Sequence, residues 1–239
     1  MDAAAYVTDA RLAGLHELTE TKSTPTDMVT AVDKASEARI VAALRELRPD
    51  DGVIAEEGTG VASQTGITWI IDPIDGTTNF VYGYPASAVS VAAVDDTGAS
   101  IAGAVVDIGR PEVFSAARGE GAFLNSDPLF LSDGPIDIGR ALVSTGFSYS
   151  PAVRVVQAEL VVRLLPVVRD IRRGGSAALD LCWAAAGRVD AYFERGTAPW
   201  DRAAGLLICT EAGLRGEVVD DLLWVAHPRI ADELLALIS

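Results

Sequence analysis

Six carboxylate residues of this sequence stand where predicted strands end or predicted helices begin, a pattern that suits a site for divalent metal ions. Carboxylates repel one another, so several of them would not converge without a cation between them. Oxygen donors with no nearby cysteine or histidine suit Mg²⁺ or Mn²⁺ better than zinc. The six residues are Asp33, Glu56, Glu57, Asp72, Asp75 and Asp201.

The stretch from Trp69 to Phe80 combines two of these carboxylates with a turn that can bind an anion. Its apolar start predicts a buried strand, and Pro73, which has no N–H to donate, predicts that the strand stops at Asp72. Residues 76–78, Gly-Thr-Thr, predict a tight turn into a helix, where free N–H groups favour a phosphate. Carboxylates would repel that phosphate unless hard cations lay between them. The stretch therefore predicts a phosphoryl-transfer site, in which one metal ion activates water and another stabilises the leaving oxygen.

Each acidic position, taken alone, also has a purely structural explanation. The Asp72–Asp75 segment fits an acidic β-turn, the pair Glu56–Glu57 fits a solvated acidic loop, and Asp33 fits a charge at a helix start. Recurrence of acids in separate parts of the chain favours the metal site over these alternatives.

The composition limits the partners of the chain. Its 239 residues include 19 Lys+Arg and 34 Asp+Glu, for a net charge of −15, so we expect neither a nucleic-acid nor a membrane partner. The N-terminal residues lack a signal-peptide layout, and no apolar run reaches about 18 residues. Cys182 and Cys209 both lie in apolar, helix-like runs, which predicts a reduced, cytoplasmic protein.

Hydrophobic periodicity predicts one domain over 1–239 with two halves, about 1–138 and about 139–239, joined by a loop at 128–140. Hairpin signals predict an antiparallel meander in the first half, and alternating strands and helices predict a mixed or parallel sheet in the second. Helices are expected over 3–20, from Asp27 or Thr30 onward, and over 153–165, 176–187, 201–213 and 230–238, with Ser176 and Asp201 as N-caps. Strands are expected at 53–55, 69–72, 88–94, 100–107, 112–117, 141–144, 167–171, 190–194, 218–219 and 222–226, with a further turn and strand within 119–125.

Four motifs, in order along the chain, resemble the inositol monophosphatase family of lithium-sensitive, magnesium-dependent phosphatases. The family pattern D-P-[IL]-D-G-T-T-N-F matches residues 72–80, and its strand-end E-E matches 56–57. The pattern K-x4-D-x-V-T-x2-D matches 22–33, and W-D-x-A-A-G matches 200–205, with E-A-G following at 211–213. The resemblance covers nearly the whole chain.

The resemblance implies an α/β (α+β) fold, a layered αβαβα sandwich of the inositol monophosphatase and fructose-1,6-bisphosphatase type. It implies a homodimer that hydrolyses a small phosphorylated alcohol, with myo-inositol 1-phosphate the leading candidate. Two or three Mg²⁺ ions per site would serve as cofactors, with Mn²⁺ as a substitute.

The resemblance also implies a role for each matching residue. Metal would be bound by Glu56, Glu57, Asp72, Asp75, Asp201 and the carbonyl of Ile74, and water would be activated by Thr77, Asp33 and Glu56. The phosphate would be held by the N–H groups of Gly76 and Thr77, and the alcohol by Gly175, Ser176, Ala177 and Glu194.

Several alternatives stay open. Relatives with similar metal motifs act on histidinol phosphate, fructose 1,6-bisphosphate, NADP or 3′-phosphoadenosine phosphates. Compact segments after Glu194 and after Gly213, where the family has a longer hairpin, favour a small polyol or amino-alcohol phosphate. From Cys182 to Arg188 the chain has the C-x5-R spacing of cysteine-dependent phosphatases, but the intervening residues predict a core helix. A non-catalytic regulator that binds Mg²⁺ or a sugar phosphate is the alternative from another class.

Overall fold

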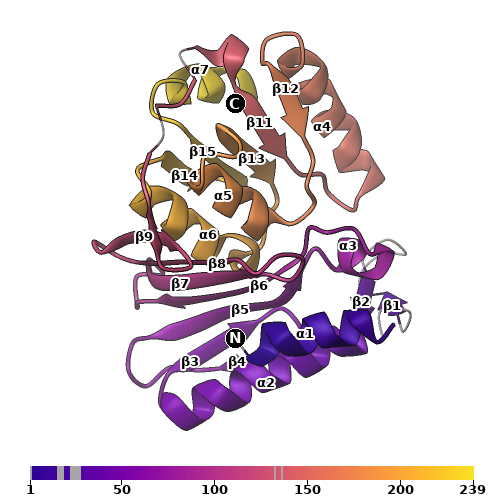
Figure 1. Cartoon of the computed structure of the whole chain (residues 1–239), viewed down its shortest axis with the longest axis vertical. Helices are drawn as coiled ribbons and strands as arrows, with labels where there is room; N and C mark the ends of the chain where they lie inside the picture. Colours follow the sequence, from indigo (N-terminus) through magenta and orange to yellow (C-terminus); the bar gives the residue numbers. More distant parts are fainter. Residues whose placement is uncertain (1, 15–18, 22–27, 132, 136) are drawn as a thin grey trace.

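The computed structural model, which describes residues 2–14, 19–21, 28–131, 133–135 and 137–239, stacks two large sheets between layers of helices (Figure 1). The outer layer at one end contains α1 (Asp2–Leu12) and α2 (Ala31–Leu47), which cover the eight-stranded sheet. Next come α5 (Ala177–Ala185) and α6 (Pro199–Glu211), then a five-stranded sheet, then α4 (Pro151–Leu164) and α7 (Ala231–Ile238). The predicted α/β fold with αβαβα layers is confirmed.

The eight-stranded sheet has the spatial order β10-β9-β8-β7-β6-β5-β3-β4. Its neighbours are antiparallel except for β3 and β5, which run parallel because the chain visits the edge strand β4 between them. The predicted meander is present, and β10 adds a strand where a loop was expected from residue 128. The strands are β3 (Gly52–Ala55), β4 (Gly60–Val61), β5 (Thr68–Asp75), β6 (Ala88–Val94), β7 (Ser100–Asp107), β8 (Val113–Ala117), β9 (Gly121–Leu124) and β10 (Asp127–Leu129).

Strand β5 does not stop at Asp72, as Pro73 predicted, but continues to Asp75 through a β-bulge. Asp72 pairs with Ser90 of β6 and Asp75 pairs with Ala88, so two residues of β5 oppose one of β6. Proline is tolerated at a bulge because its missing N–H removes no regular ladder bond there. Residues three apart in a regular strand face opposite sides of a sheet, and one extra residue brings them to the same side. The bulge therefore lets both aspartates point the same way.

The five-stranded sheet is mixed, as predicted, with the order β12-β11-β13-β15-β14. The first three strands are parallel, and β15 runs antiparallel to both of its neighbours, β13 and β14. β12 begins later than the predicted residue 167, because Val167 and Val168 donate their N–H groups to Leu164 O in the turn after α4. The strands are β11 (Leu142–Thr145), β12 (Asp170–Arg172), β13 (Ala191–Arg195), β14 (Arg215–Val219) and β15 (Leu222–Ala226), and a short 3₁₀ helix spans Ile138–Arg140.

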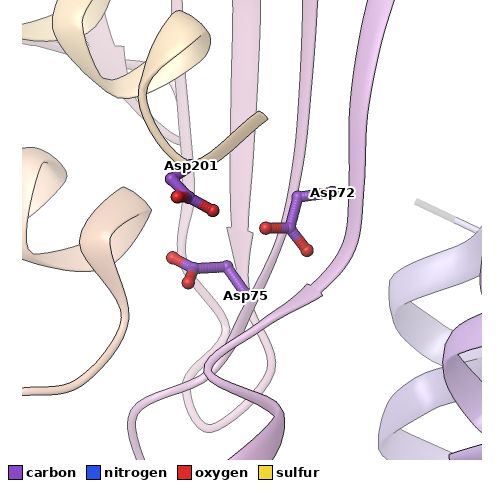
Figure 2. Close-up of side chains that lie close together, drawn as sticks. All are labelled: Asp72, Asp75 and Asp201. Carbon is purple, nitrogen blue, oxygen red and sulfur yellow. The ribbon is translucent and has the colours of Figure 1, made fainter. Parts of the chain in front are cut away.

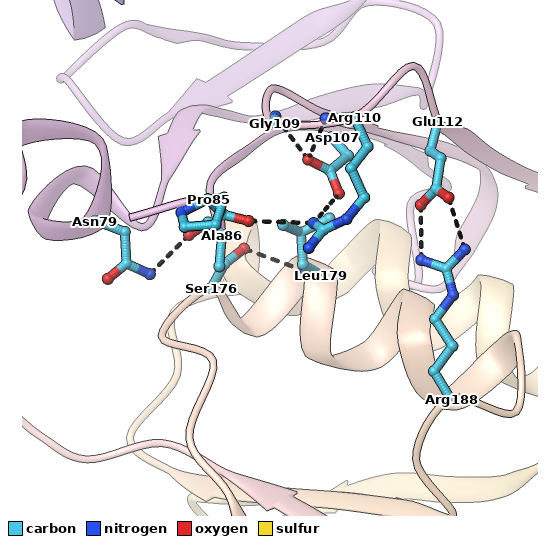
Figure 3. A network of polar contacts seen from close by, with 10 residues as sticks. All are labelled: Asn79, Pro85, Ala86, Asp107, Gly109, Arg110, Glu112, Ser176, Leu179 and Arg188. Atoms are coloured by element: carbon cyan, nitrogen blue, oxygen red, sulfur yellow. Dashed lines mark hydrogen bonds and ion pairs between the residues drawn. The ribbon is translucent and has the colours of Figure 1, made fainter. Parts of the chain in front are cut away.

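The central layer of α5 and α6 packs against both sheets and contributes much of the main core. Leu181 and Ile208 are fully buried there, between Phe114 of the first sheet and Tyr192 of the second. Polar contacts also join the layers at the edge of this core (Figure 3). Arg188, after α5, donates to both carboxylate oxygens of Glu112 at 2.7 Å.

The N-terminal helix is shorter than predicted. Helix α1 ends at Leu12, in a turn where Gly14 has a φ of +76°, and residues 19–21 form β1 (Thr19–Thr21), paired with β2 (Met28–Thr30). Helix α2 begins after its N-cap Thr30, one of the two predicted start points. The other, Asp27, lies outside the described residues. None of the helices in the described ranges is both long and apolar enough to cross a membrane.

Candidate active site

Three aspartates from different layers of the fold, two of them buried and Asp201 half-buried, point toward one another (Figure 2). Asp72 and Asp75 lie at the end of β5, and Asp201 lies in the first turn of α6. One carboxylate oxygen from each lies within 4.8 Å of the other two. Asp72 and Asp75 are only 2% and 8% exposed. The carboxyl end of a strand and the start of a helix thus meet in one acidic cluster.

Local hydrogen bonds hold each of these aspartates in place. Asp72 Oδ1 accepts from the N–H of Ile74 at 3.1 Å, which fixes it beside the bulge. Asp75 Oδ2 accepts from Ser176 Oγ at 2.7 Å and from the Ala178 N–H at 2.6 Å, both at the start of α5. The cluster is therefore tied to the central helical layer by a hydroxyl and a backbone N–H.

Asp201 is not the N-cap of its helix, as predicted, because α6 begins at Pro199 and Ala198 is the N-cap. Proline suits the first helical position, since its N–H would have no partner there. Asp201 is then the third helical residue, and its Oδ2 accepts from the Ala198 N–H at 2.6 Å. This back-bond leaves the other carboxylate oxygen available to the cluster.

Gathering these charges in a buried place is costly without a cation. Burial first, and then the nearby Glu56, raises the pKa of Asp72 well above its usual range. Burial raises the pKa of Asp75 to about 7, although the bonds from Ser176 and Ala178 oppose the rise. Burial and the charge of Asp75 also raise the pKa of Asp201 well above its usual range. All the donors are oxygen atoms, which is the ligand set that Mg²⁺ prefers.

Glu56 and Glu57, which directly follow β3, differ in their position relative to the cavity. Glu56 lines the same cavity as the three aspartates, whereas Glu57 is not among the lining residues. The loop is fixed by Glu37 of α2, whose carboxylate accepts from the N–H groups of Glu57 at 2.7 Å and Thr59 at 3.1 Å. Motif matching missed Glu37. Its spacing of one helical turn from Asp33 was the available signal, because both acids lie on the face of α2 that should be apolar.

Thr77 and Asp33 meet although 44 residues separate them. Thr77 Oγ1 lies 3.1 Å from Asp33 Oδ1 and 3.0 Å from the carbonyl oxygen of Ile74. Asp33 is fully buried, and burial raises its pKa even though hydrogen bonds from Thr30 and Thr77 oppose the rise. The other oxygen of Asp33 accepts from both the N–H and the hydroxyl of Thr30, the N-cap of α2. Lys22, from the same motif, lies outside the described residues.

The turn after β5 presents backbone N–H groups to the cavity. Gly76, with a φ of +84°, is the N-cap of α3 (Thr77–Tyr82), so the predicted turn into a helix is confirmed. Within the described ranges, the N–H groups of Gly76 and Thr77 have no hydrogen-bond partner, and both residues line the cavity. Such N–H groups at a helix start favour an anion.

The cavity that contains these groups has a volume of about 320 Å³. Of the residues predicted to contact the alcohol, Gly175, Ala177 and Glu194 line it, whereas Ser176 instead bonds Asp75 and caps α5. Sequence reasoning gave no individual role to several further lining residues. Some lie in segments that no motif covers, and others were noted only as members of a motif. They are Phe147, Tyr149, Arg173, Ala198 and Trp200.

The C-x5-R segment is a core helix, as predicted. Cys182 is fully buried in α5, and burial raises the pKa of its thiol well above its usual range. A reactive cysteine needs a lowered pKa and access to substrate. This segment therefore has no part in the chemistry of the cavity.

Comparison with known proteins agrees with this geometry. A profile of the inositol monophosphatase family matches residues 2–221. The inositol-1-monophosphatase of Mycobacterium bovis is 48% identical over 230 residues, which cover 90% of this chain and 79% of that protein. A protein of Pasteurella multocida named Nus factor SuhB is 42% identical over 231 residues, covering 92% of this chain and 85% of the relative.

Solved structures show the same architecture. Mycobacterium tuberculosis SuhB superimposes with a TM-score of 0.86 at 45% identity, over 99% of this chain and 90% of that one. The extragenic suppressor protein SuhB of Bartonella henselae has a TM-score of 0.91 at 29% identity, over 100% and 95% of the two chains. The family profile and the close relatives both span nearly the whole chain. The chain belongs to the inositol monophosphatase family of phosphoric monoester hydrolases.

Proposed function

We propose that the chain is a Mg²⁺-dependent phosphatase that hydrolyses a small phosphorylated alcohol, with myo-inositol 1-phosphate as the leading substrate. The observation that carries this proposal is the convergence of Asp72, Asp75 and Asp201, with oxygens within 4.8 Å, beside unpartnered N–H groups in one cavity. Buried like charges beside an anion-binding turn make chemical sense when cations are held between them and a phosphate.

The donor set of the cavity fits two or three Mg²⁺ ions, with Mn²⁺ as a substitute. Glu56, Asp72, Asp75, Asp201 and the carbonyl of Ile74 would hold them, and Glu57 would support a weaker ion from outside the cavity lining. When bound, Mg²⁺ supplies Lewis-acid chemistry that makes a water more acidic and stabilises charge on the phosphate and its leaving oxygen.

The residues of the chain itself then bind the ester and move a proton. The N–H groups of Gly76 and Thr77 would donate to phosphate oxygens. Because the hydroxyl of Thr77 lies within hydrogen-bond distance of Asp33, its oxygen can accept a hydrogen bond from an attacking water and orient it. Asp33, which Thr30 supports, would stabilise the positive charge that develops on the Thr77 hydroxyl as the water gives up its proton.

The remaining lining residues would bind the alcohol. Glu194 Oε2 accepts from the hydroxyl of Tyr192 at 2.6 Å, which fixes the carboxylate that would face substrate hydroxyls. The cavity volume of about 320 Å³ suits a small polyol better than a nucleotide. Histidinol phosphate, fructose 1,6-bisphosphate, NADP and 3′-phosphoadenosine 5′-phosphate are the alternative substrates within the family.

Phosphate release from a panel of these esters tests the proposal. Each ester would be assayed with Mg²⁺, with chelator, and with Li⁺ added to Mg²⁺, since we also propose that the enzyme is sensitive to lithium. We expect Mg²⁺-dependent release, fastest with inositol 1-phosphate. Faster turnover of a nucleotide phosphate, with none of inositol phosphate, would overturn the substrate assignment, and no release from any ester by folded protein would overturn the activity.

A second candidate is a non-catalytic regulator that binds Mg²⁺ or a sugar phosphate. The relatives named Nus factor SuhB support this candidate. Mg²⁺-dependent binding of inositol 1-phosphate without turnover would favour it over the enzyme.

We further propose that the chain works as a homodimer in the cytoplasm, with 1–239 as one domain. Cys182 and Cys209 are both buried and form no disulfide, which supports a reducing compartment. Light scattering of purified protein tests the dimer, and a single cooperative unfolding transition tests the domain assignment.

A further inference from the structure

Arg173 stands in the turn between β12 and α5, and its side chain folds back across the backbone toward the cavity. A Cβ atom at Gly175 would collide with the guanidinium of Arg173, so the path of this side chain depends on a glycine two residues later. The guanidinium also lies over the ring of Phe147, 6.0 Å from its centroid. The guanidinium of Arg173 therefore lies over Gly175 and beside Phe147, at the lining of the cavity.

The guanidinium of Arg173 has no hydrogen bond or ion pair with any residue in the described part of the chain. Arg172, its neighbour in sequence, pairs instead with Asp170 at 2.6 Å and does not line the active-site cavity. Arg173 lines that cavity together with Glu194 and the aspartate cluster. It is the one arginine or lysine among the described residues that line this cavity.

The positive charge of Arg173 is unusual for its acidic surroundings. The chain has a net charge of −15, and the alcohol side of the cavity is lined by the carboxylate of Glu194. Burial raises the pKa of Glu194, and the nearby Arg173 opposes that rise. Without Arg173, a substrate with a second negative group would meet only repulsion on this side. An arginine fork with free donors binds carboxylates and phosphates through two parallel hydrogen bonds.

We propose that Arg173 is a specificity-determining residue that binds a second anionic group on the alcohol part of the substrate. Between esters that differ only in a second anionic group, the doubly anionic one would then be preferred, as in sugar bisphosphates or phosphorylated hydroxy acids. This inference rests on the proposed phosphatase function. It adds to that function an order of preference among esters, set by one side chain.

Matched pairs of esters that differ in one anionic group test the inference. Fructose 1,6-bisphosphate and fructose 1-phosphate test a second phosphate, while 3-phosphoglycerate and glycerol 3-phosphate test a carboxylate. The readout is the ratio of kcat/KM within each pair, measured for wild type, Arg173→Met, Arg173→Lys and the control Arg172→Met. Thermal unfolding of each variant checks that it is folded.

We expect wild type to prefer the doubly anionic member of at least one pair by about 10-fold or more, and the pair that shows it identifies the anion. Arg173→Met should lower that ratio by about 10- to 100-fold, as expected for loss of a charged hydrogen bond. Arg173→Lys should fall between the two, because it keeps the charge without the fork. Arg172→Met should keep the wild-type ratio.

Three results would overturn the inference. One is a wild-type preference for the singly anionic member of both pairs, and another is an equal loss for both members in Arg173→Met. The third is the same change of ratio in Arg172→Met, which would indicate a general field effect. If wild type releases phosphate from inositol 1-phosphate and one of these results is found, this inference alone fails. If no ester is hydrolysed, the proposed function fails.

Discussion

Asp75→Asn separates the two consequences of a buried carboxylate, its cost in the metal-free fold and its value as a metal ligand. The amide oxygen of asparagine can replace Asp75 Oδ2 as acceptor for Ser176 Oγ and the Ala178 N–H, at 2.7 and 2.6 Å. The shape of the side chain and its contacts with α5 are therefore kept. What changes is the charge, and the second oxygen becomes an NH₂ group that cannot bind a cation.

The magnitude follows from the pKa of Asp75, which burial raises from 3.8 to about 7. That rise corresponds to about 4 kcal/mol between the two protonation states. A raised carboxyl pKa means that the folded state binds more protons than the unfolded state, so stability falls as pH rises from about 4 to about 7. Above pH 7 the full cost is present in metal-free protein. Asparagine cannot ionise and removes that cost.

Urea unfolding in chelator is the assay, at pH 3.5 and at pH 8. At pH 8 we expect metal-free Asp75→Asn to be more stable than wild type by up to about 4 kcal/mol, and at pH 3.5 the difference should nearly vanish. Added Mg²⁺ should stabilise wild type strongly and the variant weakly, and phosphate release by the variant should fall at least about 100-fold.

The matched control is Asp95→Asn, since hydrogen bonds, first from Thr97, lower the pKa of this partly exposed carboxylate to about 2. Its contribution is present above about pH 4 and is lost toward pH 2, so this variant should gain no stability at pH 8. Lower stability of metal-free Asp75→Asn at pH 8 would refute the reasoning on charge. A wild-type rate at saturating Mg²⁺ would refute the assignment of Asp75 as a ligand.

Three further predictions concern the water-orienting pair, the anion-binding turn and the contact between layers. Thr77→Val removes the hydroxyl that contacts Asp33 and should lower kcat at least about 100-fold with little change in KM, by steady-state kinetics; a change in KM alone would contradict the role. Gly76→Ala places a Cβ 2.8 Å from the carbonyl oxygen of Ala86 at a φ of +84°, and should lower the unfolding free energy by about 1–3 kcal/mol in urea titration. Arg188→Met should lower stability by about 0.5–1 kcal/mol at pH 7, since the pair with Glu112 is partly exposed. Hydrogen bonding to Arg188 lowers the pKa of Glu112, so this difference should shrink as the pH falls below that pKa, and a constant difference would count against the pair.

Much of the layered fold could be predicted from local signals in the sequence, because hairpin turns and periodicity are properties of short segments. The errors occurred where tertiary contacts or single residues override such signals. The predicted helix over 3–20 continued past Gly14, where a positive φ stops it. The N-cap of α6 was placed at Asp201, although Pro199 had already begun the helix.

The residues of the candidate site could likewise be predicted only in part from the sequence. Motif resemblance named the acids that line the cavity, because motifs record residues that function together at a distance. It gave no role to Arg173 or Glu37, whose positions depend on how the chain packs around Gly175 and on how α2 meets the loop after β3. No short segment contains either relation. The resemblance also grouped Ser176 with the alcohol contacts, whereas here its hydroxyl is used by Asp75.

Pro73 shows why a correct physical rule led to a wrong strand end and still indicated the site. The missing N–H of proline does interrupt the ladder, as expected, but a bulge absorbs the interruption and β5 continues to Asp75. In an unbroken strand Asp72 and Asp75 would face opposite sides of the sheet, and no single cation could lie between them. With two residues of β5 opposite one of β6, both carboxylates reach Asp201. The spacing D-P-x-D therefore encodes the convergence through the bulge, so the irregularity that spoils a strand prediction is what brings these two carboxylates close enough to hold one metal ion, as proposed.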